Sequence, residues 1–185
     1  MTSGPGLRAI GDAGTPSTSG PKFDRTPPQD VEAEQSVLGG MLLSKDAIAD
    51  VVEVLRGSDF YRPAHQLVYD AILDLYGRGE PADAVTVAAE LTRTGLIGRV
   101  GGHQYLHTLI AGVPTAANAG YYAEIVAERS ILRRLVEAGT RIVQMGYGAA
   151  SGEGMAGTVD DVVDRAQAEI YEVTERRTSE DYVRI

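Results

Sequence analysis

The sequence predicts an all-α protein in which a compact multi-helix body is followed by a long antiparallel helical hairpin. Apolar residues recur every three or four positions through most of the chain, which is the spacing of one face of an α-helix. Glycine and proline interrupt this pattern where helices would begin and end. The valine-rich patches are too short to indicate strands. One stretch in the second half keeps the helical period for about nine turns, which predicts an unusually long helix.

The first 26 residues are predicted to be a disordered head, because they are rich in Gly, Ser, Thr and Pro and show no periodicity. Two prolines then precede a helix whose apolar stripe runs from Val31 to Leu42. Gly39 and Gly40 lie inside this helix, where each costs about 0.5–1 kcal/mol relative to alanine. Either a neighbouring element packs closely against that turn, or the pair only weakens an ordinary helix.

Four further helices complete the predicted body, which spans residues 27–113. Each begins at a residue that suits an N-terminus, such as a capping Ser or Asp or a first-turn proline. Each ends near a glycine or a break in the apolar stripe. The predicted limits of these helices are Ser44 and Gly57, Pro63 and Gly77, Asp83 and Gly95, and Gly102 and Ile110.

The longest helical pattern follows a turn at Pro114, where Thr115 is a candidate N-cap, and continues to about Gly146. A bend near residues 129–131 would divide it into two consecutive helices. Gly139 and Gly146 lie on its apolar stripe, where the absence of a side chain allows another helix to approach closely.

A glycine-rich loop over residues 146–157 separates this pattern from the last helix. Thr158 and Asp161 form a capping-box-like pattern at the start of that helix. Two long amphipathic helices joined by such a loop predict an antiparallel hairpin over residues 114–177.

The apolar stripe of the hairpin predicts an interface, because exposed apolar patches of this extent are rare on monomers. The alternative is that the hairpin folds back on its own body. Under the first interpretation, a partner covers this stripe. The residues expected in this interface are Ile131, Leu132, Leu135, Val136, Ile142, Val143, Val162, Val163, Ala166, Ile170 and Val173.

The composition favours a protein-binding role. The 26 acidic residues outnumber the 17 basic ones, for a net charge of −9, whereas binding to nucleic-acid phosphates needs a concentrated basic surface. There is no cysteine for a disulfide or a thiolate metal site. No apolar run approaches the roughly 18–20 residues of a membrane span, and the N-terminus lacks the pattern of a secretion signal. A cytoplasmic protein is expected.

The sequence carries no constellation that predicts catalysis. A phosphate-binding GxxxxGK[ST] loop is absent, and the nearest string, Gly14–Lys22, has a proline before its lysine and no strand before it. His103 and His107 share a helix face, but Gln104 stands where a zinc protease helix has its glutamate. These histidines are interpreted as surface residues, and His65 is assigned to packing or hydrogen bonding in the first turn of its helix. No catalytic, cofactor-binding or metal-ligating residue is predicted.

The densest group of basic residues lies on the long helix. Its members are Arg129, Arg133, Arg134 and Arg141. Glu137 is spaced to pair with Arg141 on the same helix. A solvated stripe beside an interface is the favoured interpretation, and contact with DNA or with an acidic partner is the alternative. The acidic residues, including Glu34, are assigned to solvated helix faces opposite the apolar stripes.

Four blocks carry a family resemblance. They are PPQDVEAEQSVLGGMLL at 27–43, FYRPAHQLVYDAI at 60–72, VGGHQYL at 100–106 and PTAANAGYYAEIVAERSILR at 114–133. Together they resemble the N-terminal domain of bacterial DnaB-type replicative DNA helicases. Order and spacing agree from Pro27 to about Arg177, although no single block is a catalytic signature.

The resemblance implies a homodimer formed through the hairpins, with three dimers forming a collar on a hexameric ring at replication forks on the nucleoid. The collar would dock a DnaG-type primase, and a helicase loader is left open as a further partner. DNA contact is expected only through the assembled ring, with no membrane association. The resemblance assigns ATP and magnesium to a C-terminal domain beyond this chain, with residues 178–185 as the start of the linker to it. The alternative is a free-standing helical adaptor or scaffold without a motor domain.

Overall fold

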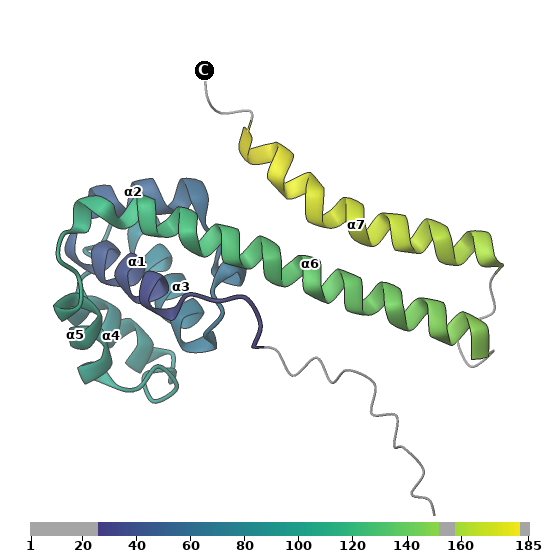
Figure 1. Ribbon diagram of the computed structural model, residues 1–185. Helices are drawn as coiled ribbons and strands as arrows, with labels where there is room; N and C mark the ends of the chain where they lie inside the picture. Colours follow the sequence, from purple (N-terminus) through teal and green to yellow (C-terminus); the bar gives the residue numbers. More distant parts are fainter. Residues whose placement is uncertain (1–25, 152–157, 182–185) are drawn as a thin grey trace, which may run out of the picture.

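The predicted caps and breaks give rise to a series of short helices followed by two long ones (Figure 1). The computed structural model describes residues 26–151 and 158–181, and within these ranges it contains helices and turns but no strand. The all-α prediction is confirmed, whereas the predicted disordered head lies outside the described residues except for Thr26. The elements are α1 (Val31–Leu43), α2 (Lys45–Val54), η1 (Gly57–Asp59), α3 (Pro63–Gly77), α4 (Ala84–Arg93), α5 (His103–Ala111), η2 (Ala116–Asn118), α6 (Ala119–Ser151) and α7 (Val159–Asp181).

Polar side chains begin three of these helices as predicted. The Ser44 hydroxyl accepts a hydrogen bond from a backbone N–H in the first turn of α2, and the Ser44 N–H donates to the last turn of α1. Asp83 Oδ1 accepts from Thr86 N at 3.0 Å at the start of α4. Thr158 and Asp161 bond reciprocally before α7, at 2.7 and 3.3 Å, as a capping box. Ser44 therefore serves two helices at once, and α1 and α2 meet at a one-residue corner.

The second helix ends at Val54, so the prediction that Gly57 terminates it is wrong. Leu55 turns to an extended conformation, buries its side chain in the core, and accepts a hydrogen bond from Tyr69 Oη at 2.6 Å. Gly57 instead begins η1, where a Cβ atom would lie 2.5 Å from Asp70 Oδ1.

One continuous helix, α6, belongs to both the body and the hairpin (Figure 1). Its first turns bury Ala119, Ala123 and Val126 in the same hydrophobic core as α1 to α5, although the sequence analysis assigned residues from 114 onward to the hairpin. The bend proposed near residues 129–131 does not break the helix. It also continues to Ser151, so the predicted loop is wrong for residues 146–151, while its remainder lies outside the described residues.

The outer half of α6 and the antiparallel α7 extend away from the body, so the alternative of a folded-back hairpin does not hold (Figure 1). Ala138 is fully buried and Val173 is 9% exposed where the two helices run together. Arg141 Nη2 lies 2.6 Å from Glu169 Oε2 across the hairpin. The hydrogen bond from Arg141 to Glu169 is the main cause that raises the pKa of Arg141, and the predicted partner Glu137 adds only a weaker charge interaction.

The glycine pair inside α1 is explained by close packing. A Cβ atom at Gly39 would lie 2.3 Å from the backbone oxygen of Leu109 and 2.4 Å from a methyl carbon of Val113. A Cβ atom at Gly40 would lie 2.9 Å from the Cβ of Ala119. Helix α5 therefore packs against α1 at Gly39, and the start of α6 packs against it at Gly40. The alternative of a merely weakened helix is wrong.

A charge cluster joins the end of α3 to α4. Glu90, only 7% exposed, accepts hydrogen bonds from Arg93 Nη2 at 2.6 Å and Nε at 3.0 Å, and lies 3.4 Å from Arg78 Nη2. The hydrogen bond from Arg93, with that from Arg78, lowers the pKa of Glu90 from 4.5 to about 2. Because the folded pKa is depressed, the stabilisation is fully present above pH 4.5 and is lost as pH falls toward 2.

Replacement of Glu90 by Gln is therefore expected to reduce the fall in melting temperature between pH 4.5 and pH 2. Thermal unfolding followed by circular dichroism at several pH values measures this effect. The exposed Glu80, which pairs with Arg78 at 3.1 Å, provides the matched control variant E80Q. Identical pH profiles for E90Q and the unaltered protein would contradict the assignment.

Candidate functional site

An exposed apolar face runs along the hairpin. On α6 it comprises Leu132, Leu135, Val136, Val143 and Tyr147. On α7 it comprises Val159, Val163, Ile170 and Tyr171. The exposed fraction of these side chains ranges from 42% for Leu132 to 77% for Val159. Most of them recur at steps of three or four residues, so they share one side of each helix. We call this set the hairpin face.

The structure divides the predicted interface residues into two groups. Leu132, Leu135, Val136, Val143, Val163 and Ile170 are exposed and belong to the hairpin face. Ile131, Ile142, Val162 and Ala166 are half-buried, and Val173 is buried. Tyr147 was not among the predicted interface residues, because the glycines around it predicted a loop. Tyr171 was not predicted either, since it follows Ile170 directly at the edge of the stripe.

An open groove of about 520 Å³ lies between the two helices of the hairpin. Its walls are mainly apolar and come from α7, with one α6 residue. They are Ile142, Val163, Ala166, Gln167, Ile170, Tyr171 and Thr174. The groove thus adjoins the hairpin face, and the two together offer a continuous apolar surface rather than a catalytic cleft.

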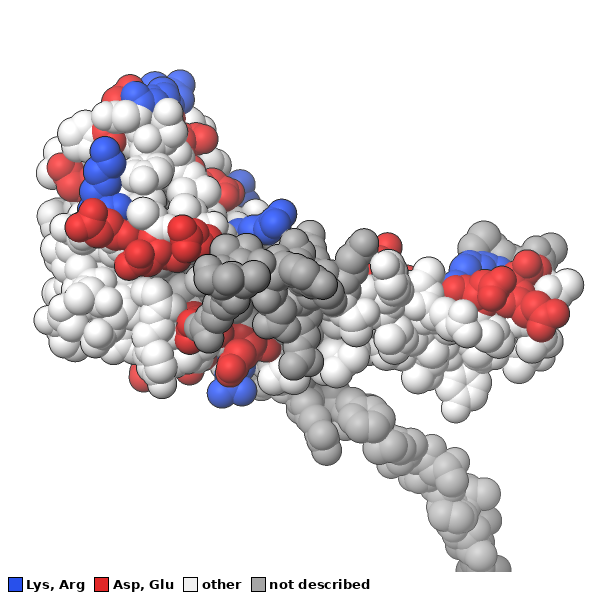
Figure 2. Space-filling view, turned by 90° about the horizontal axis from the view of Figure 1, so that it is seen from above, with Lys and Arg blue, Asp and Glu red and all other residues white. Residues whose placement is uncertain are grey.

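Charged side chains are unevenly distributed over the face of the molecule that Figure 2 shows. Figure 2 shows them on the body and near the far end of the hairpin, whereas the middle of the hairpin presents mostly uncharged atoms in this view. A surface of this kind is suited to close contact with an apolar partner surface, because burial removes few charges from water.

The four arginines of the long helix have different roles. Arg129 is exposed, and Arg141 pairs with Glu169 inside the hairpin. Arg133 and Arg134 are half-buried and bond to the body around Asp59. The interpretation as a solvated stripe is therefore wrong for Arg133 and Arg134, because their guanidinium groups already have partners within the chain.

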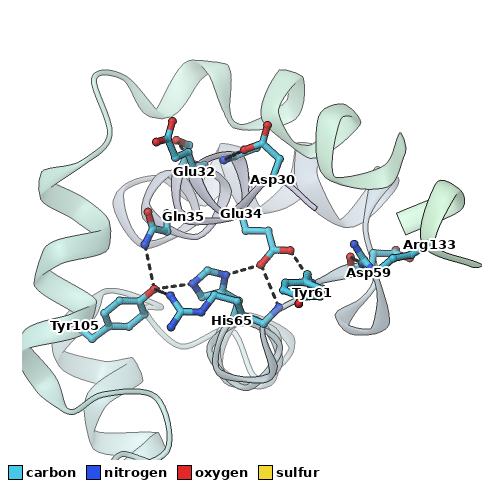
Figure 3. A network of polar contacts seen from close by, with 12 residues as sticks. Asp30, Glu32, Glu34, Gln35, Asp59, Tyr61, His65, Tyr105 and Arg133 are labelled. Carbon is cyan, nitrogen blue, oxygen red and sulfur yellow. Dashed lines mark hydrogen bonds and ion pairs between the residues drawn. The ribbon is translucent and has the colours of Figure 1, made fainter. Parts of the chain in front are cut away.

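A second polar cluster is buried between α1, α3 and α5 (Figure 3). Glu34 is 1% exposed, so its assignment to a solvated face is wrong. Its Oε2 atom lies 2.6 Å from Nδ1 of His65, which is fully buried, and Nε2 of His65 lies 2.6 Å from Tyr105 Oη. Glu34 also accepts from the backbone N–H of Tyr61 at 2.6 Å. The prediction that His65 packs or hydrogen-bonds at its turn is confirmed.

The donors and acceptors of this cluster balance in one arrangement. Tyr105 Oη accepts from Gln35 Nε2 at 3.2 Å and from Arg62 Nη1 at 3.4 Å, so its own proton is donated to His65 Nε2. His65 then carries its proton on Nδ1 and donates it to Glu34. Both carboxylate oxygens of Glu34 and both ring nitrogens of His65 thus have partners within the protein, and the cluster joins three helices.

The described residues do not form an evident metal-binding site. His103 and His107 are both exposed on α5. Within residues 26–151 and 158–181 no group of three or more His, Asp or Glu side chains is arranged to hold an ion. None of the helices in those ranges has the length and apolar character needed to cross a membrane.

Comparison with known proteins shows which family this chain resembles in sequence. Residues 26–128 match the family described as DnaB-like helicase N terminal domain. The replicative DNA helicase DnaB of Mycobacterium leprae (strain TN) is 75% identical over 161 residues, which cover 87% of this chain and 26% of that protein. The chain thus spans about a quarter of that relative's length.

Two solved structures are similar. The crystal structure of the N-terminal domain of DnaB helicase from Mycobacterium tuberculosis has 76% sequence identity and a TM-score of 0.73, covering 80% of this chain and 99% of that one. A structure described as a DnaB-like replicative helicase and its interactions with primase has 22% identity and a TM-score of 0.61, covering 78% of this chain and 31% of that one. The second likeness concerns the fold alone.

A helical body with a protruding two-helix hairpin is thus the fold of a replicative-helicase N-terminal domain. The chain belongs to the DnaB-like helicase N-terminal domain family.

Proposed function

We propose that this chain is the N-terminal collar domain of a replicative DNA helicase, and that the hairpin face pairs two subunits. Three such pairs would form the collar of a hexameric ring. The observation that carries the proposal is the exposure of the nine large apolar side chains of the hairpin face, five from α6 and four from α7. Burial of apolar surface contributes about 25 cal/mol per Å², which is offset by the cost of ordering two subunits.

The same proposal includes a docking role for the collar. A DnaG-type primase is the proposed partner, and a helicase loader is a further one. Support comes from family membership and from the similar fold of a helicase studied with primase. ATP and magnesium would act in a separate C-terminal domain, and DNA would be contacted through the assembled ring, in the cytoplasm at replication forks.

Substitution of Leu135 by Asp tests the pairing. Leu135 lies within the hairpin face and is 47% exposed, so a charge there should not disturb the core of the chain. If it is an interface residue, L135D is expected to weaken self-association about 30-fold, or ~2 kcal/mol, because the carboxylate would be buried without a partner. Size-exclusion chromatography with light scattering at tens of micromolar measures the mass.

The matched control is Val85→Asp, because Val85 is 72% exposed on α4, in the body. In a dilution series we expect a dimer mass for the unaltered chain and for V85D at tens of micromolar, and dissociation of L135D to a monomer at concentrations about 30-fold higher than for V85D. A monomeric unaltered chain, or the same dependence of mass on concentration for L135D and V85D, would contradict the proposed pairing. Added DnaG-type primase in the same measurement tests docking through formation of a heavier complex.

A further inference from the structure

A short stretch of α6 marks the change from body to hairpin. Toward the body, Ala127 is the last residue of α6 that packs against the hydrophobic core, within the described part of the chain. Toward the tip, Ala138 is fully buried in the part of α6 beyond the hydrophobic core. Between these two positions, Ser130, Arg133 and Arg134 make polar contacts with the body. The contacts that hold the hairpin at its base are therefore polar.

Asp59 receives most of these contacts. It is only 4% exposed, and its Oδ1 atom accepts from Ser130 Oγ at 2.8 Å and from the guanidinium of Arg134. Its Oδ2 atom accepts from the backbone N–H of Arg56 at 2.8 Å. A buried carboxylate is stable only where hydrogen bonds and an opposite charge replace water. The buried carboxylate of Asp59 is therefore stabilised by the positive charge of Arg134, and Asp59 in turn holds the Arg134 side chain in place.

Arg133 makes a second connection at the same turn. Its Nη1 atom donates to the carbonyl oxygen of Pro28 at 2.8 Å, and its Nη2 atom donates to the backbone oxygen of Asp59 at 2.5 Å. The guanidinium carbon lies 5.6 Å from the centre of the Tyr61 ring, which is a cation–π contact (Figure 3). Because the guanidinium is planar and rigid, these three contacts together fix the orientation of the Arg133 side chain. One arginine ties α6 to η1 and to the segment before α1.

The loop that carries Asp59 and Tyr61 is itself fixed to the body. Glu34 accepts from the backbone N–H of Tyr61 at 2.6 Å and from that of Arg62 at 3.4 Å. Glu34 is buried in α1, and its remaining contact is with His65 of α3. The two arginines of α6 therefore bond to a part of the chain that two other helices hold in place.

We propose that Asp59, Arg133 and Arg134, which we name the root cluster, set the direction in which the hairpin leaves the body. The apolar contacts of α6 with the core end at Ala127, so the root cluster opposes tilting of the helix beyond that residue. From Arg134 to Ser151 the helix rises about 25 Å, so a tilt of about 10° moves its end by about 4 Å. A displacement of that size would misalign the hairpin face with any rigid partner.

This inference concerns a single chain and holds whether or not two hairpins pair. If the root cluster only stabilised the fold, substitutions in it would lower the melting temperature but leave the direction of the hairpin unchanged. The test must therefore measure the direction itself. The sequence has no cysteine, so two introduced cysteines can be labelled without any background.

Spin labels at Val85→Cys on α4 and Gln144→Cys on α6 report the distance between body and hairpin by double electron–electron resonance. Both positions are exposed. Labelled chains are diluted with unlabelled chains, so that the measured distances lie within one molecule. The variants are Arg134→Gln and Arg133→Gln, and the matched control is Arg129→Gln, which replaces an exposed arginine of the same helix. Circular dichroism establishes that each variant is folded.

A narrow distance distribution is expected for the unaltered chain and for R129Q. For R134Q and R133Q the distribution is expected to broaden or to shift by about 2–3 Å, because Gln144 lies about 15 Å along the helix from Arg134 and a tilt of about 10° moves it by that amount. If one of R134Q and R133Q fails to fold, the other tests the proposal. If both fail to fold, the root cluster is needed for folding, and the proposal that it sets only the hairpin direction is overturned. Folded root variants with the same distribution as R129Q would also overturn the proposal. A monomer in the light-scattering experiment would contradict the pairing and leave this result unaffected.

Discussion

Gly39→Ala is expected to destabilise the folded domain by about 3 kcal/mol, at the upper end for an overpacked core. The added carbon would lie 2.3 Å from the backbone oxygen of Leu109 and 2.4 Å from a methyl carbon of Val113. Val113 could change its rotamer, but the carbonyl belongs to α5 and can move only with that helix. The gain in helix propensity, about 1 kcal/mol, is smaller than the cost of separating α5 from α1.

Denaturant unfolding at equilibrium measures this loss. The control is Gly77→Ala, because Gly77 is also helical and a Cβ atom there would meet nothing within 4 Å. G77A is expected to be neutral or to gain up to about 1 kcal/mol from reduced freedom of the unfolded chain. Equal free energies of unfolding for G39A and G77A would show that the close contact between α1 and α5 is absent in solution.

Glu34→Ala is expected to cost about 3–5 kcal/mol, because several donors inside the protein would lose the acceptor that they share. The carboxylate accepts from His65 Nδ1 and from the backbone N–H groups of Tyr61 and Arg62. Without it the Nδ1 proton of the buried His65 and the N–H of the half-buried Tyr61 would lose their acceptor, and each unsatisfied buried group costs about 1–3 kcal/mol. The N–H of Arg62, an exposed residue, would also lose a partner.

The same denaturant titration measures the loss for E34A. Glu32→Ala removes an exposed carboxylate from the same helix and serves as the control, with an expected change within about 0.5 kcal/mol. Glu34→Gln keeps one acceptor oxygen, so its loss should fall between those of E34A and E32A. An E34A variant as stable as E32A would mean that water or another group replaces the carboxylate.

Local patterns in the sequence predicted most of the helix starts. Ser44, Asp83 and Pro63 were recognisable because capping and first-turn preferences act over a few residues. The helix end near residue 146 was placed too early, because Gly146 and Gly148 lower helix propensity only modestly. Packing of α6 beside α7 overrides such a preference.

Contacts between distant segments account for the errors at polar residues. Glu34 falls on the apolar stripe of α1, but its partners His65 and Tyr61 lie 31 and 27 residues later in the chain. Arg133 and Arg134 have helical spacing that suits a solvated surface, yet they reach back to Asp59, which lies more than 70 residues earlier. Periodicity shows which residues share a face but not which distant segment meets that face.

The candidate site was predicted as a region and not residue by residue. The stripe residues of the hairpin include both those that pack between α6 and α7, such as Val173, and those that remain exposed, such as Val143. Sorting them requires the rotation of each helix about its own axis. That rotation follows from tertiary packing, including the pairing of Arg141 with Glu169.

The continuity of α6 limits which changes in hairpin length keep the hairpin face in the same orientation relative to the body. Because the same uninterrupted helix lines the core and carries the hairpin face, inserting one residue beyond Ala127 would turn everything beyond it by about 100°. Insertion of seven or eleven residues would bring the outer face back to within about 20° of its present orientation. Only insertions close to a whole number of helical turns, such as these, would lengthen the hairpin and keep its face aligned with the body.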